Sequence, residues 1–220
     1  MYIDTFKLNR FLILFSGFCI FLLITRVVIT SHFFYSFLVW NLFLAIVPYV
    51  ISSWLLRTQW IRKHNFPLLI VLGIWLLFLP NAPYIITDLI HLTYSESAWN
   101  WLDPFMLFAF ALNGLLLGIL SLQHIFQVLT DKWNKTTAKR MLFCVVFLCG
   151  FGIYLGRFLR WNSWEFFSDP LLFVKECFVS LTHPWYRTRT WGMTLGFGMF
   201  LWILFLGIQA CMPIKKASRE

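Results

Sequence analysis

Apolar residues fill six long runs of the chain, and short polar segments separate these runs. The runs cover about 11–30, 33–56, 66–90, 104–126, 141–159 and 191–212. A helix needs about 20 apolar residues to cross the hydrocarbon core of a bilayer. The pattern therefore predicts an all-α protein, a polytopic membrane helix bundle with six transmembrane helices in a single integral membrane domain over residues 1–220.

The third run contains an interruption, the segment Pro80-Asn81-Ala82-Pro83. Before it, residues 67–79 make only about 20 Å of helix, which is too short to cross. Each proline also lacks the N–H group that would bond a carbonyl one turn earlier. In hydrocarbon, such a backbone persists only when it is buried in protein or lines a wet cavity. Two interpretations follow: a plain kink, or a broken helix of the kind that forms binding sites in transporters.

A seventh apolar segment, residues 170–183, is too short and too charged to cross a membrane. One of its faces is apolar and carries Leu171, Val174, Phe178 and Leu181. This spacing predicts an interfacial helix between the fifth and sixth spans. Asp169 before Pro170 predicts its N-cap, and Asp103 before Pro104 predicts the N-cap of the fourth span.

Small and polar residues inside the spans predict how the helices pack. Three pairs of glycines, each four residues apart, favour close packing within the bundle: Gly114 and Gly118, Gly152 and Gly156, and Gly192 and Gly196. Asn41 and Asn113 fall near the middle of the second and fourth spans. Interhelical hydrogen bonds worth about 1 kcal/mol each are the expected role, and ligand binding is the alternative.

The composition agrees with a membrane protein, since 60% of the residues are hydrophobic and 12% are charged. The net charge of +9 comes from basic residues in short clusters between the apolar runs. Such clusters are typical of the charges that orient membrane spans, and they are not typical of nucleic-acid binding. With the N-terminus inside, the cytoplasmic segments carry 12 of the 18 Lys and Arg residues. We therefore expect a multipass protein of the cell membrane with N- and C-termini cytoplasmic. The odd number of cysteines, five, and the lack of Cys/His ligand spacing predict no disulfide framework, cofactor or metal.

Two polar clusters stand out against this apolar background. Asp88 and His91 follow the interruption at a spacing of three, which places them on one face of a continuing helix, with Tyr84 one turn earlier. They suit a hydrated interface, a general acid and base, or half of a metal site. Two ligands alone do not define a metal site.

The second cluster is GRFLRWNSWEF, residues 156–166, at the end of the fifth span. Arg157 and Arg160 are also three residues apart, and Asn162 and Glu165 follow them. Paired arginines can hold a phosphate or carboxylate in a bidentate manner. They can equally pair with Asp88 or Glu165 and lock the helices together.

Both clusters fall at a similar depth on the extracytoplasmic side of the six-span topology. We expect them to converge in one polar site with these candidate residues: Asn81, Tyr84, Asp88, His91, Arg157, Arg160, Asn162 and Glu165. Its partners would be membrane lipids, with an anionic small molecule or a lipid headgroup as ligand.

Three functions fit such a site. A small transporter or transport accessory is slightly favoured, and a homo-oligomer would supply the symmetry that a chain without duplicated halves lacks. A membrane-embedded enzyme acting on a lipid-linked or envelope substrate is the second, with Asp88, His91 or Glu165 as the catalytic candidates. The third is a scaffold protein whose polar cluster locks the helices.

At the two clusters the sequence resembles a bacterial family of multipass membrane proteins, domain of unknown function 1361. The segments that carry the resemblance are LFLPNAPYIITDLIHL, residues 77–92, and GRFLRWNSWEFF, residues 156–167. The resemblance extends over most of the chain from the second span onward. In that family Asp is the commoner residue where Glu165 stands. The resemblance implies a bacterial membrane protein of similar topology, but no reaction, ligand or catalytic residue.

Overall fold

The computed structural model describes residues 5–94, 101–161, 168–182 and 184–211, and no strand occurs among them. Counting the interrupted third span as one, six helices in this part of the chain are long and apolar enough to cross a membrane. The predicted all-α multipass bundle is therefore confirmed. Its long helices are α1 (Thr5–Thr30), α2 (Phe37–Arg57), α6 (Leu102–Lys132), α7 (Lys135–Tyr154) and α10 (Pro184–Cys211).

The third span is interrupted, as the sequence predicts, and it consists of three pieces. The helix α4 (Asn65–Phe78) is followed by the single turn α5 (Asn81–Tyr84) and the 3₁₀ helix η2 (Ile85–Tyr94). The interruption lies at Leu79 and Pro80, between α4 and α5. We call the segment from Leu79 to Tyr84 the break.

Polar groups of the break find partners within it and at the end of α4. The Ala82 N–H donates to the Leu79 carbonyl over 3.1 Å. This is the carbonyl that Pro83 cannot bond. The Asn81 Nδ2 donates to the carbonyl of Phe78 over 2.9 Å. The span therefore changes direction without leaving these two carbonyls unpaired, which satisfies a requirement of backbone in hydrocarbon.

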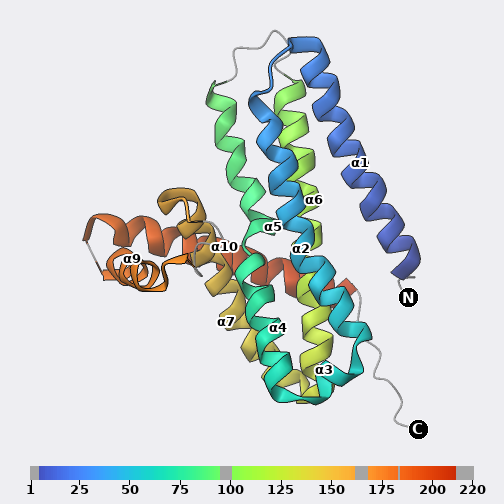
Figure 1. The fold of residues 1–220 in the computed structure, drawn as a ribbon, viewed down its shortest axis with the longest axis vertical. Helices are drawn as coiled ribbons and strands as arrows, with labels where there is room; N and C mark the ends of the chain where they lie inside the picture. The colour runs from blue at the N-terminus through green and yellow to red at the C-terminus, as the bar shows by residue number, and fades with distance from the viewer. Residues whose placement is uncertain (1–4, 95–100, 162–167, 183, 212–220) are drawn as a thin grey trace.

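The helix ends fall on two sides of the bundle (Figure 1). The start of α1, the short helix α3 (Gln59–Lys63), the turn between α6 and α7 and the end of α10 lie toward the lower and right-hand part of the view. We call this the N-terminal side. The turn between α1 and α2, which contains the 3₁₀ turn η1 (Phe34–Ser36), lies with η2 and α9 toward the opposite, far side. Successive helix ends alternate between these two sides, as expected when six spans cross a membrane in alternating directions.

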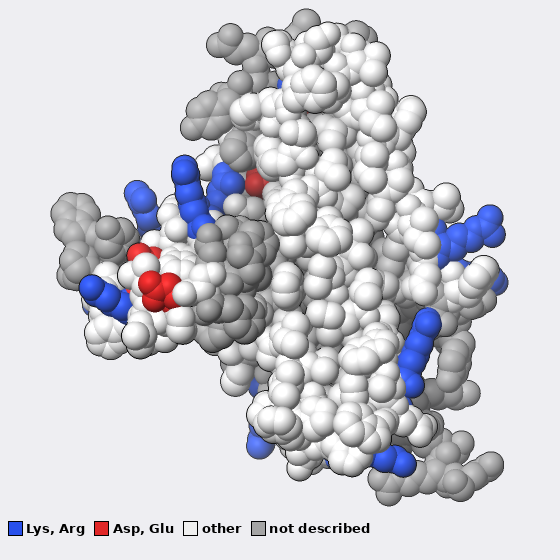
Figure 2. Space-filling model, viewed as in Figure 1, with Lys and Arg blue, Asp and Glu red and all other residues white. Residues whose placement is uncertain are grey.

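Charged residues avoid the middle of the molecule (Figure 2). On the visible face, Lys and Arg side chains lie along the lower and right-hand edges and on the part that projects to the left. The wide surface between them carries almost no charge. This distribution fits a chain whose apolar belt faces lipid.

The short helix between the fifth and sixth spans is α9 (Pro170–Thr182), and it projects from the side of the bundle (Figure 1). The predicted N-cap is confirmed, since the Asp169 Oδ1 accepts from the Leu172 N–H over 3.0 Å. Leu171, Val174 and Phe178 are exposed to 84%, 61% and 67%. Such an apolar face suits the predicted position at the membrane surface.

The fourth span, α6, is the centre of the bundle, and polar contacts tie it to three other helices. The Trp75 Nε1 donates to the Ser121 hydroxyl over 2.7 Å, and that hydroxyl donates to the Pro48 carbonyl over 2.8 Å. The Asn113 Nδ2 donates to the Ser16 hydroxyl over 2.9 Å. The prediction that Asn113 makes an interhelical hydrogen bond is confirmed.

The predicted cap at Asp103 is wrong, because α6 begins one residue earlier, at Leu102. The Asp103 carboxylate is buried and accepts from the Arg26 Nε over 3.2 Å. Arg26 also donates to the His32 carbonyl over 2.7 Å and lies 4.8 Å above the Tyr35 ring. The Asp103 carboxylate therefore pairs with Arg26 of α1 and does not cap α6.

Only two of the three glycine pairs pack as predicted. Gly114 and Gly118 of α6 contact the break, and so do Gly152 of α7 and Gly156, which lies two residues beyond α7. The pair at Gly192 and Gly196 is wrong, since a Cβ there would meet nothing within 4 Å. The close approach of α7 to α10 occurs instead at Gly150, where a Cβ would lie 2.6 Å from the carbonyl oxygen of Thr194.

Candidate functional site

The break lies in a groove between α6 and α7 that glycines create. A Cβ on Gly114 would lie 2.5 Å from the carbonyl oxygen of Ala82. On α7, a Cβ on Gly152 would lie 2.5 Å from the Pro80 ring. Distances this short exclude any side chain at either glycine without movement of the backbone or ring. The two helices therefore hold the break closely from both sides.

Beyond the break, η2 carries Asp88 into a buried polar network. The Asp88 residue is 1% exposed. Its Oδ1 lies 3.3 Å from the Arg157 Nη1, and its Oδ2 accepts from the Asn41 Nδ2 over 2.7 Å. Three segments far apart in the sequence, α2, η2 and the end of the fifth span, meet at this one carboxylate. A buried carboxylate needs such partners, because an unpaired charge in this position would be strongly unfavourable.

The two arginines do not share a helix face, although they are three residues apart. After α7 the chain widens into the π turn η3 (Leu155–Leu159), which contains Arg157. Arg160 then adopts the left-handed conformation, with φ of 58° and ψ of 27°. The helical spacing of three residues therefore fails between them. Arg160 is exposed, and it forms no ion pair with another residue of the described segments.

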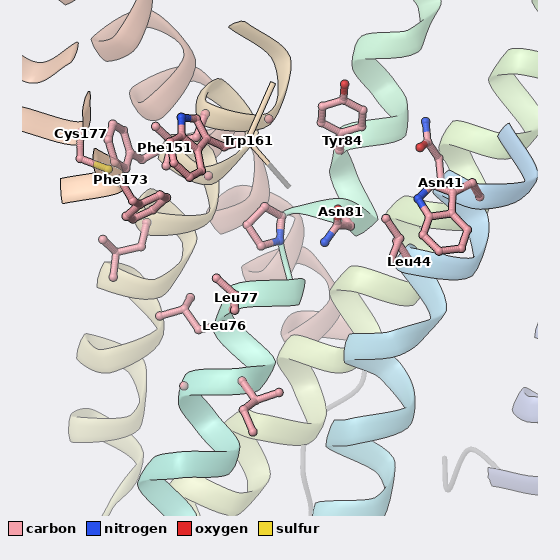
Figure 3. Close-up of a pocket in the computed structure, with 18 residues that line it drawn as sticks. Asn41, Leu44, Leu76, Leu77, Asn81, Tyr84, Phe151, Trp161, Phe173 and Cys177 are labelled. Carbon is pink, nitrogen blue, oxygen red and sulfur yellow. The ribbon is translucent and has the colours of Figure 1, made fainter. Parts of the chain in front are cut away.

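A pocket of about 650 Å³ lies beside the break. Figure 3 shows Asn81 and Leu77 at its centre, Asn41 and Leu44 on one side, and Phe151, Phe173 and Trp161 on the other. The lining comes from α2, α4, the break, α7, η3, Trp161 and α9. The pocket reaches from Gly73 and Leu148, in the middle of α4 and α7, to Tyr84 near the far side.

The two ends of this pocket differ in chemistry. The end near the far side has the side-chain amides of Asn41 and Asn81 and the phenol of Tyr84. The deeper end is apolar and includes Leu76 and Leu148. An amphipathic cavity of this kind accommodates a molecule with one polar and one apolar end.

The rim of the pocket lies at the surface of the bundle. Trp40, Ile74 and Leu148 line the pocket and are exposed to 52%, 43% and 52%. They belong to spans two, three and five, so part of the rim lies on the outer surface of the bundle. A Cβ at Gly73 would meet nothing within 4 Å, so open space continues beside α4. The pocket therefore opens sideways, between the spans.

One wall of the pocket is formed by α9 and by Trp161, which lies two residues after the end of η3. Phe173 and Cys177 of α9 line the pocket together with Trp161. The Trp161 Nε1 donates to the Glu176 Oε2 over 2.5 Å and joins the two segments. Burial raises the pKa of the Cys177 thiol, and the neighbouring Glu176 carboxylate raises it further. This thiol therefore remains protonated near neutral pH and acts as part of the apolar lining.

The candidate residues from the sequence separate into groups. Asn81 and Tyr84 line the pocket, whereas Asp88 and Arg157 form the ion pair beside it and do not line it. Arg160 neither lines the pocket nor takes part in this ion pair. The side chain of His91, together with Asn162 and Glu165, lies outside the described residues.

Sequence reasoning missed several residues of the site. Asn41 was expected to bond between helices, and it also links the ion pair to the pocket. The aromatic residues of α9 and Gly73 carried no distinguishing pattern, because phenylalanine and glycine occur throughout the chain. The helical spacing of Phe173 and Cys177, four residues apart, is the one feature that could have suggested a common face.

Comparison with known proteins yields a family but no characterised relative. No curated protein and no solved structure matches the chain. One family model matches residues 40–204, which contain the break, the ion pair and every residue that lines the pocket. The chain therefore belongs to the family described as Protein of unknown function (DUF1361).

Proposed function

We propose that this protein binds a membrane lipid or a lipid-linked molecule in the pocket beside the break. The observation that carries the proposal is the pocket itself, which is apolar in its deeper part, polar near the far side and open to the hydrocarbon. A lipid tail would lie between α4 and α7. Its polar end would lie near the amides of Asn41 and Asn81.

The same proposal places the pocket in the outer half of the cell membrane. The described residues at the N-terminal side include most of the basic residues, among them Lys7, Arg62, Lys132 and Arg140. Cytoplasmic loops are enriched in Lys and Arg. The N-terminal side is then cytoplasmic, with both termini, and the polar end of the pocket faces the extracytoplasmic side.

In this account the Asp88–Arg157 pair has a positioning role. Both Asp88 oxygens are engaged, and the residue is buried and outside the pocket lining. It holds Asn41 toward the pocket and fastens η2 to the fifth span. The ion pair then has the role of the predicted helix lock. The neighbouring Asn41, Asn81 and Tyr84 form the polar end of the proposed binding site.

Binding is better supported than acid–base catalysis. Among the described residues that line the pocket, none is a histidine or a carboxylate, and these are the commonest general acids and bases. A pocket open to the bilayer also lets a lipid enter and leave without crossing water. We therefore favour a role in lipid transport, as a carrier or an accessory subunit.

Replacing Gly73 by leucine tests this function. The new side chain would enter the open space beside α4 and displace part of a bound tail. Loss of about two buried CH₂ groups, at ~0.8 kcal/mol each, would weaken binding roughly tenfold. Native mass spectrometry of the protein purified in mild detergent would measure the retained lipid.

Gly17→Leu is the matched control, because Gly17 lies on α1, also has open space, and is not part of the pocket. Wild type and Gly17→Leu should retain the same lipid, and Gly73→Leu should lose most of it. Equal retention by all three proteins, or no retained lipid in any of them, would contradict the proposal.

A further inference from the structure

A second cavity lies at the N-terminal side, far from the pocket described above. Its volume is about 610 Å³, and it lies between α3, the start of α4 and the end of α6. Its charged lining residues are Arg62, Lys63, Asp131 and Lys132. Three cations therefore face one carboxylate, which leaves an excess of positive charge in the cavity.

The cavity is held in shape by contacts between α3 and the end of α6. The Lys132 Nζ donates to the backbone carbonyls of Arg62 and Lys63 over 2.9 and 3.3 Å. These bonds satisfy carbonyls at the end of α3 and fix the two segments to each other. The cations are therefore gathered by the fold and do not depend on mobile loops.

One donor in this cluster is buried without an acceptor. The Arg62 Nη1 lies 3.3 Å from the Asp131 Oδ2, and the Asp131 side chain is 52% exposed. The Arg62 Nε is buried and has no hydrogen-bond partner among the described residues. A buried donor without a partner is unfavourable, so an acceptor supplied by a ligand would stabilise this arrangement.

The start of α4 adds to the positive potential. Asn65 lines the cavity and is the first residue of α4, a helix of 14 residues. The preceding residue, His64, makes no side-chain hydrogen bond that caps the helix. Pro67, the third residue of the helix, has no N–H group, so the N–H groups of Asn65 and Phe66, together with the helix dipole, favour an anion at this position.

From these features we infer that the cavity binds a phosphate group. An arginine fork with lysines and a helix N-terminus is a donor set that suits the several oxygens of a phosphate. Trp133 and Trp60, exposed to 48% and 63%, lie on the adjoining segments and are typical of membrane–water interfaces. The phosphate then belongs either to the headgroup of an anionic lipid or to a free phosphate-bearing molecule, and basic cavities at this depth suit the former.

The test uses the full-length protein in mild detergent. Phosphatidylglycerol, phosphatidylcholine or inorganic phosphate is added, and binding is measured by native mass spectrometry and by the shift of the thermal unfolding midpoint. Arg62→Gln and Lys63→Gln should each weaken phosphatidylglycerol binding about tenfold, since each removes a charge-assisted contact. Lys63 forms no ion pair with a described residue, so its variant should fold even if Arg62→Gln does not.

Two controls separate the cavity from general surface charge. Arg140→Gln removes an exposed cation that does not line the cavity, and should leave binding unchanged. Asp131→Asn removes the one carboxylate and should keep or strengthen binding. Phosphatidylglycerol binding without inorganic phosphate binding would identify a lipid headgroup as the source, and binding of inorganic phosphate would identify a soluble one.

The inference is overturned if neither phosphatidylglycerol nor inorganic phosphate binds the wild-type protein. It is also overturned if phosphatidylcholine binds as tightly as phosphatidylglycerol while inorganic phosphate does not bind, or if Arg140→Gln weakens binding as much as Lys63→Gln. None of the substituted residues lines the pocket at the break, so a change of binding in these variants reports on the cavity, whereas retention of lipid in Gly73→Leu reports on the pocket.

Discussion

Asp88→Ala is expected to destabilise the folded protein by about 3–5 kcal/mol, the usual consequence of removing one partner from a buried ion pair. The substitution leaves the Arg157 guanidinium, whose side chain is 19% exposed, without its carboxylate. It also leaves the Asn41 amide without its acceptor. A lower midpoint of thermal unfolding in detergent, and a lower yield of folded protein, would measure the effect.

Two further variants show whether the loss comes from the pair. Asp131→Asn breaks an exposed ion pair with Arg62 and should change the free energy of unfolding by less than about 1 kcal/mol. Asp88→Ala combined with Arg157→Leu removes both charges and should recover part of the lost stability. If Asp88→Ala unfolds at the same temperature as wild type, the ion pair does not lock η2 to the fifth span.

Gly114→Ala should destabilise the protein by about 1–3 kcal/mol, the range for adding a methyl group to a filled core. The new Cβ would lie 2.5 Å from the carbonyl oxygen of Ala82 and 2.9 Å from the Ile85 Cδ1. The first contact is with backbone, which a change of rotamer cannot relieve. The break would have to move away from α6. The midpoint of unfolding in a graded sodium dodecyl sulfate titration would report the change.

Gly17→Ala is the control for this substitution, because a Cβ there meets nothing within 4 Å. Alanine favours a helix over glycine by up to about 1 kcal/mol, so this variant should be as stable as wild type or more stable. A loss of stability at Gly17 equal to that at Gly114 would show that glycine is needed for a reason other than the close approach of the break.

The broad architecture could be predicted because its causes are local. The length of an apolar run fixes whether a helix can span the membrane, and a proline removes a hydrogen bond wherever it stands. The six spans and the interruption of the third follow from these two rules. The meeting of Asp88 with Arg157 was also expected, since few charges occur at this depth and each needs a partner.

The details that were predicted wrongly depend on contacts between helices. Arg157 and Arg160 keep a helical spacing in sequence, but a π turn and a left-handed residue change their directions. Gly192 and Gly196 match a packing motif that the tertiary structure does not use. The helix that approaches α7 does so at Gly150, which forms no such pair. A glycine motif indicates only that close packing is possible. The position of the neighbouring helix determines where close packing occurs.

The pocket itself could not be inferred from sequence. Its lining comes from five helical elements together with the break and Trp161, and most of its residues are ordinary apolar ones. Asn41 illustrates the difficulty, since its position in α2 gave no indication that Asp88 would bond it. Only the tertiary arrangement shows that the break and α9 enclose one space and that the ion pair lies beside it.

The most direct test of lipid binding is a density map of the protein determined by electron cryomicroscopy in lipid nanodiscs. The account predicts an elongated density between α4 and α7 that passes Gly73 and Leu148 and ends near Asn41 and Asn81. A map that resolves these side chains and shows the pocket filled only by them, or closed by contact of α4 with α7, would contradict the central claim.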